Sequence, residues 1–193
     1  MEIKGARAVT IIIHPANPDW PLHFQRVKAR LMPALPEGAA LHHIGSTAVP
    51  GLAAKDIIDI QVSVRRLDEI DPTALQVAGF MRRAPVSDHC PPGMTLAPED
   101  LAKRLFGATD PKANVHVREV GRFNQRYPLV CRDYLRARPL AAAAYGAIKQ
   151  NLAVRFAQDA DSYYAIKDPV FDLIMAGAED WALVTGWQLP EGD

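Results

Sequence analysis

The sequence predicts an α+β fold, in which a mixed β-sheet is flanked by helices and followed by a helical C-terminal part. Short runs that alternate apolar and polar residues occupy the first two thirds of the chain, about residues 1–126. Apolar residues at helical spacing dominate from about residue 127 to residue 190. The length of 193 residues is that of one ordinary domain, so we expect residues 1–193 to form a single domain.

The N-terminal part predicts one strand and one helix. The apolar run Val9–Ile13 is typical of a short strand. Asp19 can cap a helix that carries Pro21 in its first turn. Apolar residues then recur at helical spacing, and two prolines end the helix. The apolar positions are Trp20, Phe24, Val27 and Leu31, and the prolines are Pro33 and Pro36.

Two further strands follow, and the second has the clearest alternation in the chain. Leu41–Ile44 is a short strand that leads into a Gly-Ser-Thr turn. In Ile57–Val64, side chains alternate between an apolar and a more polar face, as expected of a half-buried strand. The apolar face holds Ile58, Ile60, Val62 and Val64, and the other face holds Ile57, Asp59, Gln61 and Ser63.

The middle of the chain predicts a short helix, a long loop and a hairpin. Asp71 precedes Pro72, which together favour a helix that runs to about Ala78. Residues 85–98 hold four prolines and Gly93, and a loop of this length predicts a lid or a disordered flap. Two strands with a turn between them then form a probable hairpin, Arg104–Ala108 and Asn114–Glu119.

Three helices are predicted beyond Tyr127. The first ends near Arg138, and the second begins at Pro139. The last begins near Asp161 or Asp168 and runs toward Trp181. In the second helix, the residues that fall roughly in phase are Leu140, Ala144, Ile148, Leu152 and Phe156, which predicts that they face the core.

The composition excludes several classes of protein. The 22 basic and 22 acidic residues argue against a general nucleic-acid binder and against an acidic disordered chain. No apolar stretch is long enough to cross a membrane, and the start of the chain lacks a signal-peptide pattern. Cys90 and Cys131 lie far apart, so we expect no disulfide scaffold and a cytoplasmic location. The charge is unevenly distributed, since residues 103–138 hold nine basic and three acidic residues.

The strongest chemical signal is Gly45-Ser46-Thr47, followed by Lys55 and Asp59. Glycine lets the backbone approach a phosphate closely, and the serine hydroxyl can donate to phosphate oxygens. A strand carboxylate that faces such a turn can hold a Mg²⁺ ion that bridges the phosphates. From these residues alone, a glycine turn followed by one polar strand residue remains an equal alternative.

A wider pattern resembles the GrpB family. Its specific part is Gly-Ser-Thr-Ala-Val-Pro-Gly-Leu over residues 45–52, followed by Lys55 and by Ile57-Ile58-Asp59-Ile60. Weaker blocks extend the resemblance over nearly the whole chain. They are Asp19-Trp20-Pro21 with Phe24, residues 114–117, residues 132–136, Tyr145 with Lys149, and Tyr164 with Lys167. Related domains also occur fused to dephospho-CoA kinase.

The resemblance implies a nucleotidyltransferase-like sheet of the polymerase-beta type. In that superfamily a Gly-Ser turn holds nucleotide phosphates, and up to three strand acids bind two divalent metals. Carried over to this chain, Ser46 would contact phosphates and Asp59 would be the first acid. Gln61 stands where the second acid is expected, and His116 or Asn114 stands in the strand that would offer the third. An amide is a poor Mg²⁺ ligand beside a carboxylate, so one acid of the usual three remains.

Other polar residues predict the rest of a pocket. The resemblance places Arg132 and Lys149 at the phosphates, together with Lys55. His116 falls on the polar face of its strand, where a metal ligand, a phosphate donor, a general base and an exposed residue are all consistent with the pattern. His42 and His43 alternate, so only one of them can face a pocket at the turn. Asp88-His89-Cys90 has no matching partner spacing, and no metal site is expected there.

Two functions are consistent with these residues. The first is transfer of a nucleotidyl or phosphoryl group from a nucleoside triphosphate to an unknown acceptor. Ser46 would then contact the phosphates, Asp59 would hold Mg²⁺, and Lys55, Arg132 and Lys149 would neutralise charge. The second is a degenerate module that binds a nucleotide or a CoA-like ligand without chemistry, which Gln61 favours. The expected partner is in either case a phosphate-bearing small molecule, and RNA binding is less favoured because no aromatic-rich strand pattern occurs.

Overall fold

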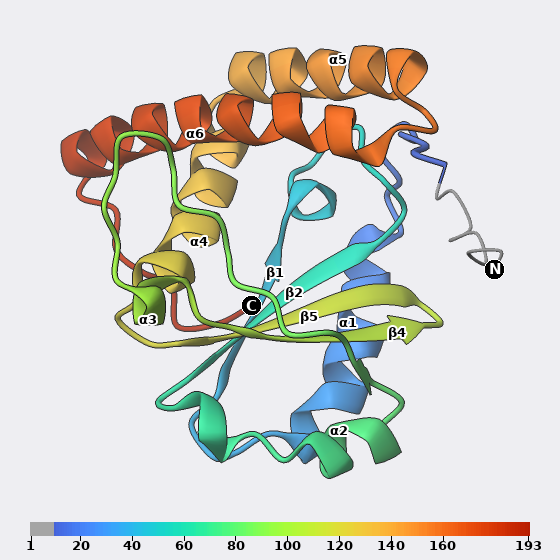
Figure 1. The fold of residues 1–193 in the computed structure, drawn as a ribbon, viewed down its shortest axis with the longest axis vertical. Helices are drawn as coiled ribbons and strands as arrows, with labels where there is room; N and C mark the ends of the chain where they lie inside the picture. The colour runs from blue at the N-terminus through green and yellow to red at the C-terminus, as the bar shows by residue number, and fades with distance from the viewer. Residues whose placement is uncertain (1–9) are drawn as a thin grey trace, which may run out of the picture.

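A computed structural model describes residues 10–193, which form a five-stranded mixed β-sheet between two groups of helices (Figure 1). The strand order is β1-β2-β5-β4-β3, in which β2 and β5 are parallel and the other neighbours are antiparallel. The expected α+β class is therefore confirmed. The strands are Ala40–Ile44 (β1), Ile58–Val64 (β2), Met81–Arg82 (β3), Arg104–Thr109 (β4) and Lys112–Glu119 (β5). The α-helices are Trp20–Leu31 (α1), Pro72–Val77 (α2), Pro98–Leu101 (α3), Phe123–Ala137 (α4), Pro139–Arg155 (α5) and Ala160–Thr185 (α6).

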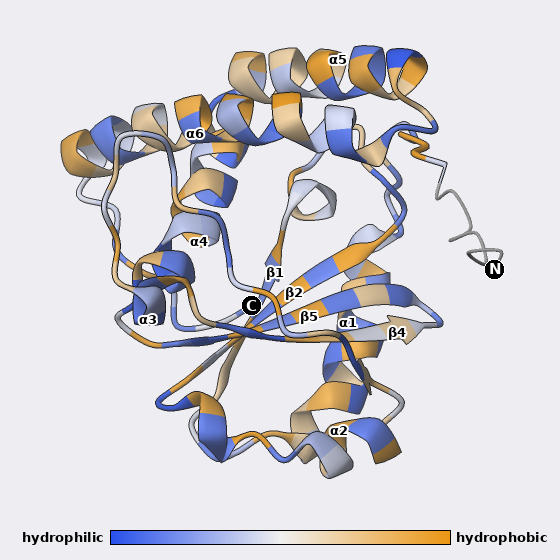
Figure 2. Cartoon of the chain, viewed as in Figure 1, coloured by the Kyte–Doolittle hydropathy of each residue, from blue (hydrophilic) through white to orange (hydrophobic). Residues whose placement is uncertain are grey.

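One face of the sheet is apolar and packs against α1 and α2. The predicted alternation of β2 is visible as alternating hydrophobic and hydrophilic segments along that strand (Figure 2). Burying these side chains is the main source of stability for this half of the molecule. The core here includes Trp20, Phe24, Val27 and Leu31 of α1, Ile58, Ile60, Val62 and Val64 of β2, and Leu75 of α2.

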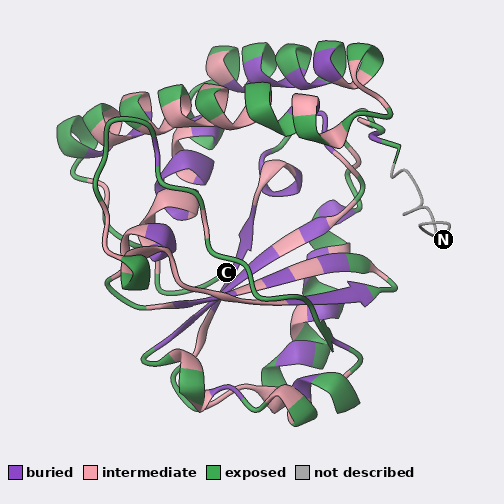
Figure 3. Cartoon of the chain, in the orientation of Figure 1, coloured by how far each residue is buried: buried purple, intermediate pink, exposed green. Residues whose placement is uncertain are grey.

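The opposite face of the sheet is polar and lies toward α4, α5 and α6. Because β2 and β5 are parallel neighbours, their register places Asp59 beside Asn114 and Gln61 beside His116. Helices α5 and α6 run side by side on this side of the molecule, and their outer surfaces are exposed (Figure 1, Figure 3). Within residues 10–193, no helix combines the length and apolar character that crossing a membrane requires.

The N-terminal expectations need two corrections. Residues 10–13 form no strand, and Val9 lies outside the described residues. Ile11 is buried against Leu152 and Tyr163, and its backbone N–H donates to the carbonyl of Ala157 between α5 and α6, so the run packs without pairing to the sheet. Asp19 precedes α1 as predicted, but its side chain makes no capping hydrogen bond.

Two other helices, α2 and α6, begin at an aspartate cap. The Asp71 carboxylate accepts from the backbone N–H of Thr73, as the Asp-Pro pair predicts. Asp159 caps α6 in the same way, and Gly186 ends it in the left-handed region. Helix α4 begins at Phe123, four residues before the predicted start. The prediction missed this first turn because it is largely polar and carries no apolar periodicity. The short elements β3 and α3 were not predicted.

The predicted buried face of α5 is wrong. Leu140 is 88% exposed and Ile148 is 37% exposed, whereas Leu152 is buried as expected. The inward face instead contains Tyr145 and Lys149. A lysine on the inward face does not follow from apolar spacing, and it directs attention to what lies beneath the helix.

Candidate functional site

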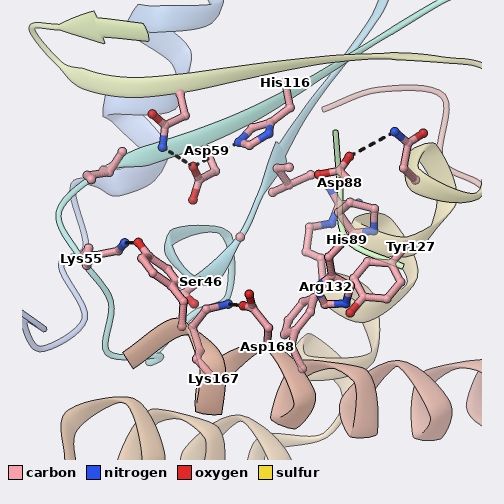
Figure 4. A pocket seen from close by; sticks show the side chains of 18 of the residues that line it. Ser46, Lys55, Asp59, Asp88, His89, His116, Tyr127, Arg132, Lys167 and Asp168 are labelled. Atoms are coloured by element: carbon pink, nitrogen blue, oxygen red, sulfur yellow. Dashed lines mark hydrogen bonds and ion pairs between the residues drawn. The ribbon is translucent and has the colours of Figure 1, made fainter. Parts of the chain in front are cut away.

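A cavity of about 670 Å³ lies between the polar face of the sheet and the C-terminal helices (Figure 4). Strands β2 and β5 line one side, and α4, α5 and α6 line the other. The volume is within the range of small-molecule sites, about 300–1,000 Å³. Nearly all residues predicted for the site line this cavity, and Gln61 is the exception. Those that line it are Gly45, Ser46, Thr47, Lys55, Asp59, His116, Arg132 and Lys149.

The turn at residues 45–47 lies directly against Asp59. Gly45 has φ +71° and ψ −170°, a region of backbone conformation that is essentially limited to glycine. A β-carbon at position 45 would lie 2.7 Å from Oδ2 of Asp59, which is closer than non-bonded atoms approach. Glycine is therefore required both by the backbone and by the carboxylate beside it.

Two side chains of β5 orient the Asp59 carboxylate. Asn114 Nδ2 donates to Asp59 Oδ1 at 2.9 Å, and His116 Nε2 lies 3.6 Å from the same oxygen. Burial alone would raise the pKa of Asp59, but His116, Asn114 and Lys55 outweigh burial and lower the pKa, so the carboxylate is ionised at neutral pH. Burial lowers the pKa of His116, which favours the neutral imidazole. No hydrogen bond from residues 10–193 reaches Asp59 Oδ2, which leaves this oxygen available to a ligand.

Lys149 connects α5 to the Gly-Ser-Thr turn. Its Nζ atom donates to Ser46 Oγ and to the backbone carbonyl of Ala53, both at 2.6 Å. Only 3% of Lys149 is exposed. Burial lowers the pKa of Lys149 to about 7, and the nearby charges of Lys167 and Lys55 act in the same direction. Several positive charges thus gather beside Ser46, which is favourable for binding an anion.

The pKa of Lys149 predicts how stability depends on pH. The folded-state pKa lies below the value of about 10.4 for an unfolded lysine, so between the two values the unfolded chain binds more protons and stability rises with pH. Between about pH 7.5 and 8.5, we expect the free energy of unfolding of wild type to rise by about 1 kcal/mol more than that of Lys149→Met. Urea titrations at both pH values measure this difference. Lys112→Met, at an exposed lysine, should keep the wild-type slope, and equal slopes for wild type and Lys149→Met would contradict the assignment.

Gln61 belongs to a buried hydrogen-bond network behind the cavity. Its side chain is fully buried, and its amide nitrogen Nε2 donates to the backbone carbonyl of Gln125 at 2.8 Å. Its Oε1 accepts from Arg118 Nη1 at 2.8 Å. The structure thus places Gln61 on the same strand face as Asp59, as predicted, but its oxygen is already occupied by a guanidinium. It does not line the cavity.

Arg118 also joins Gln61 to Asp88, a residue that was not predicted for the site. Asp88 Oδ2 accepts from Arg118 Nε at 2.8 Å and from Asn124 Nδ2 at 3.1 Å. Lys103 Nζ also contacts the Asp88 carboxylate. Burial would raise the pKa of Asp88, but the charges of Arg118 and Lys103 outweigh burial and hold that pKa well below its usual range. Asp88 is therefore a carboxylate shared between two largely buried cations.

These contacts correct the prediction of a disordered flap. The segment from residue 83 to residue 97 has no regular structure, but it crosses the cavity and residues 86–89 line it. Asp88 holds it to β5 and α4, and His89 Nε2 lies 2.8 Å from Asp172 of α6. The part of the prediction that placed a lid here is consistent with this position. Sequence patterns could not identify Asp88, because its partners are distant in the chain.

Arg132 and Thr47 line the cavity but are already engaged by protein groups. Arg132 Nη1 donates to the carbonyl of His43 at 3.0 Å and to Asp193 Oδ2 at 2.7 Å, which ties α4 to β1. The Thr47 hydroxyl lies 3.0 Å from His43 Nε2. The His43 ring stacks on Phe24 with centroids 4.8 Å apart, and burial lowers its pKa to about 4. Neither His43 nor His42 lines the cavity, although the alternation of the strand allowed one of them to face it.

The sequence model of the family described as "GrpB protein" matches residues 10–176. This chain belongs to the GrpB family. The crystal structure of conserved protein GrpB from Enterococcus faecalis aligns with a TM-score of 0.71 at 27% identity, over 88% of this chain and 99% of that one. The resemblance predicted from the Gly-Ser-Thr block is therefore confirmed.

Named relatives of this GrpB chain fall into two groups. A dephospho-CoA kinase of Mycolicibacterium paratuberculosis is 37% identical over 95% of this chain and 49% of its own length. UPF0157 protein YqkA of Bacillus subtilis is 32% identical over 91% of this chain and 48% of its own length. UPF0157 protein SCO7215 of Streptomyces coelicolor is 32% identical over 90% of this chain and 86% of its own length. The chain thus spans about half the length of the first two relatives and most of the third.

Proposed function

We propose that this GrpB chain binds the phosphates of a nucleotide in the cavity and transfers a nucleotidyl or phosphoryl group to an acceptor. The observation that carries the proposal is the contact between Asp59 and Gly45, with Lys149 hydrogen-bonded to Ser46 in the same turn. An ionised carboxylate thus lies beside a turn that can bind phosphates, and Lys149 brings positive charge to that turn. We also propose that the sheet is of the nucleotidyltransferase-like type.

The residues at Asp59 fit one divalent cation better than two. Mg²⁺ is commonly held by one or two carboxylates together with substrate phosphates. Asp59 offers one carboxylate whose Oδ2 accepts no hydrogen bond from the described residues, and His116 and Asn114 adjoin it. In residues 10–193, no group of three or more His, Cys, Asp or Glu side chains lies where it could hold a metal. When bound, Mg²⁺ would offset phosphate charge and polarise the reacting phosphorus.

The chain's own residues would position the ligand and neutralise charge. Ser46 would donate its hydroxyl proton to a phosphate oxygen, because in its contact with Lys149 the hydroxyl oxygen is the acceptor. Lys149 and Lys55 would neutralise the negative charge that develops on the phosphates. The Lys55 ammonium donates a hydrogen bond to the Tyr164 hydroxyl, and its Nζ atom lies 4.9 Å from the centroid of that ring. Within the described residues it pairs with no carboxylate, so none competes with a phosphate for this charge.

A second candidate is a binding module without chemistry. The observation that favours it is the hydrogen bond from Arg118 to Gln61, because this position carries a guanidinium contact where the superfamily would place a metal-binding acid. The relatives named dephospho-CoA kinase make a CoA-like ligand reasonable for such a module, by association only.

Calorimetry with ATP, GTP and CoA, with and without Mg²⁺, tests both functions. For group transfer, we expect ATP or GTP to bind at least about tenfold more tightly with Mg²⁺, and Asp59→Asn to abolish this enhancement and any product formation. Asp68→Asn, at an exposed aspartate, is the matched control and should behave as wild type.

Product analysis separates the two candidates. Metal-independent binding of nucleotide or CoA, with no product after incubation with candidate acceptors, supports the module. If none of the three ligands binds, or if Asp59→Asn keeps full Mg²⁺-dependent binding, the proposed transfer site is wrong.

A further inference from the structure

A continuous row of aromatic rings lines one wall of the cavity. Phe123 and Tyr127 of α4 have ring centroids 5.5 Å apart, and Tyr127 and Phe171 of α6 also lie 5.5 Å apart. Tyr145 of α5 lies 5.7 Å from Phe171. All four rings line the cavity. Phe123, Tyr127 and Phe171 are only half-buried, so although Tyr127 and Phe171 also pack against core residues, part of each ring is left exposed in the cavity lining.

Tyr127 is held in one orientation at the middle of this wall. Its hydroxyl donates to Asp172 Oδ1 at 2.8 Å, and His89 Nε2 lies 2.8 Å from the same oxygen. The His89 and Tyr127 rings meet edge to face, with centroids 6.4 Å apart. A ring whose orientation is set by such contacts loses little freedom when a planar ligand stacks on it, which favours binding.

The aromatic wall is joined to the cationic end of the cavity through Lys167. Its Nζ lies 5.7 Å from the Phe171 ring centroid and 5.8 Å from that of Tyr164. Tyr164 in turn contacts Lys55. Figure 4 shows Lys55, Ser46 and Lys167 on one side of the cavity and His89 and Tyr127 on the other. One end therefore carries Lys55 and Lys167, of which Lys167 is paired with Asp168, the other end is aromatic, and both ends line the same cavity.

We propose that the aromatic wall formed by Phe123, Tyr127 and Phe171 stacks the base of a nucleotide whose phosphates lie at residues 45–47. The proposal rests on the proposed function and adds to it the place where the base of the nucleotide binds. A base stacks on an aromatic face whatever its identity, because every base has a π-face, and such stacking is a substantial part of binding. The two ends of the cavity match the two ends of a nucleotide.

Comparing ATP with inorganic tripolyphosphate tests the base site separately from the phosphate site. We expect wild type to bind ATP about tenfold or more tightly than tripolyphosphate. Tyr127→Leu should lose most of this difference by weakening ATP about tenfold, while its affinity for tripolyphosphate stays unchanged. Tyr127→Phe keeps the ring and loses only the hydroxyl contact with Asp172, so it should recover most of the ATP affinity.

A second variant and a folding control keep the result interpretable. Phe123→Leu removes a ring from the same wall and should also weaken ATP and spare tripolyphosphate. Thermal unfolding identifies any variant that fails to fold. If wild type binds both ligands equally, or if Tyr127→Leu and Phe123→Leu bind ATP like wild type, the base site is wrong and phosphate binding stands. If wild type binds neither ligand, the phosphate site itself fails, and the base site with it.

Discussion

Replacing Asp88 with alanine is expected to lower the free energy of unfolding by about 3–5 kcal/mol, because it leaves two buried cations without their shared carboxylate. The Arg118 side chain is 5% exposed and that of Lys103 is 9% exposed. Both side chains are largely enclosed by protein, so each charge would remain largely desolvated. Urea unfolding of wild type and Asp88→Ala measures the loss.

The same substitution should free the segment at residues 83–97. The Asp88 side chain holds it to β5 and α4. In Asp88→Ala the segment would keep only the contact of His89 with Asp172 and backbone hydrogen bonds such as that from residue 88 to the carbonyl of Leu101. We expect limited proteolysis to cut Asp88→Ala within this segment under conditions that leave wild type whole. Asp68→Ala removes the carboxylate of an exposed ion pair with Arg66 and serves as the control. It should change stability and cleavage little. A stability of Asp88→Ala equal to that of the control would show that Arg118 and Lys103 do not depend on Asp88.

The stability of this network should also depend on pH. The pKa of Asp88 is lowered in the folded state, so its contribution is present above the unfolded value of about 3.9 and is lost as the pH falls through the folded value. Acid unfolding of wild type should therefore include a component that Asp88→Ala lacks. This component lies below about pH 4, which distinguishes it from the Lys149 effect above neutral pH.

Local periodicity was sufficient to predict the strand that carries the site. The alternation of Ile57–Val64 separates Asp59 and Gln61 from the apolar residues, and the same separation occurs in β2. A period of two determines which face each residue occupies once one face is buried. The turn at residues 45–47 was predictable because it follows the short strand β1 directly in sequence.

Sequence patterns were insufficient wherever burial involved charge or distant partners. The apolar spacing of α5 favoured Leu140 and Ile148, but the helix turns Lys149 inward, where it donates to Ser46 and to the carbonyl of Ala53. The run Val9–Ile13 has strand composition, but residues 10–13 have no neighbouring strand with which to pair. Asp88 lies in a proline-rich segment with no periodicity, and its partners Arg118 and Lys103 follow it by 30 and 15 positions.

Replacing Gly45 with alanine should damage both stability and the site. The backbone at Gly45 has φ +71° and ψ −170°, and enforcing such a conformation on another residue costs about 1–3 kcal/mol. The new β-carbon would also lie 2.7 Å from Asp59 Oδ2 and 3.1 Å from the Asp59 β-carbon, so the aspartate must move. Since the proposed cation depends on this carboxylate, we expect the Mg²⁺-dependent enhancement of nucleotide binding to disappear.

Gly51→Ala provides a matched control from the same turn region, without the clash with Asp59. Gly51 has φ +77°, so alanine there is also strained, but a β-carbon would meet nothing within 4 Å. Both variants should therefore be destabilised in urea titrations, Gly45→Ala the more because of its clash with Asp59, and only Gly45→Ala should lose Mg²⁺-dependent nucleotide binding in calorimetry. If the two variants bind nucleotide equally, the close approach of residue 45 to Asp59 has no role in binding. A selective loss in Gly45→Ala would connect the glycine of the turn to the carboxylate it contacts, and through it to the proposed chemistry.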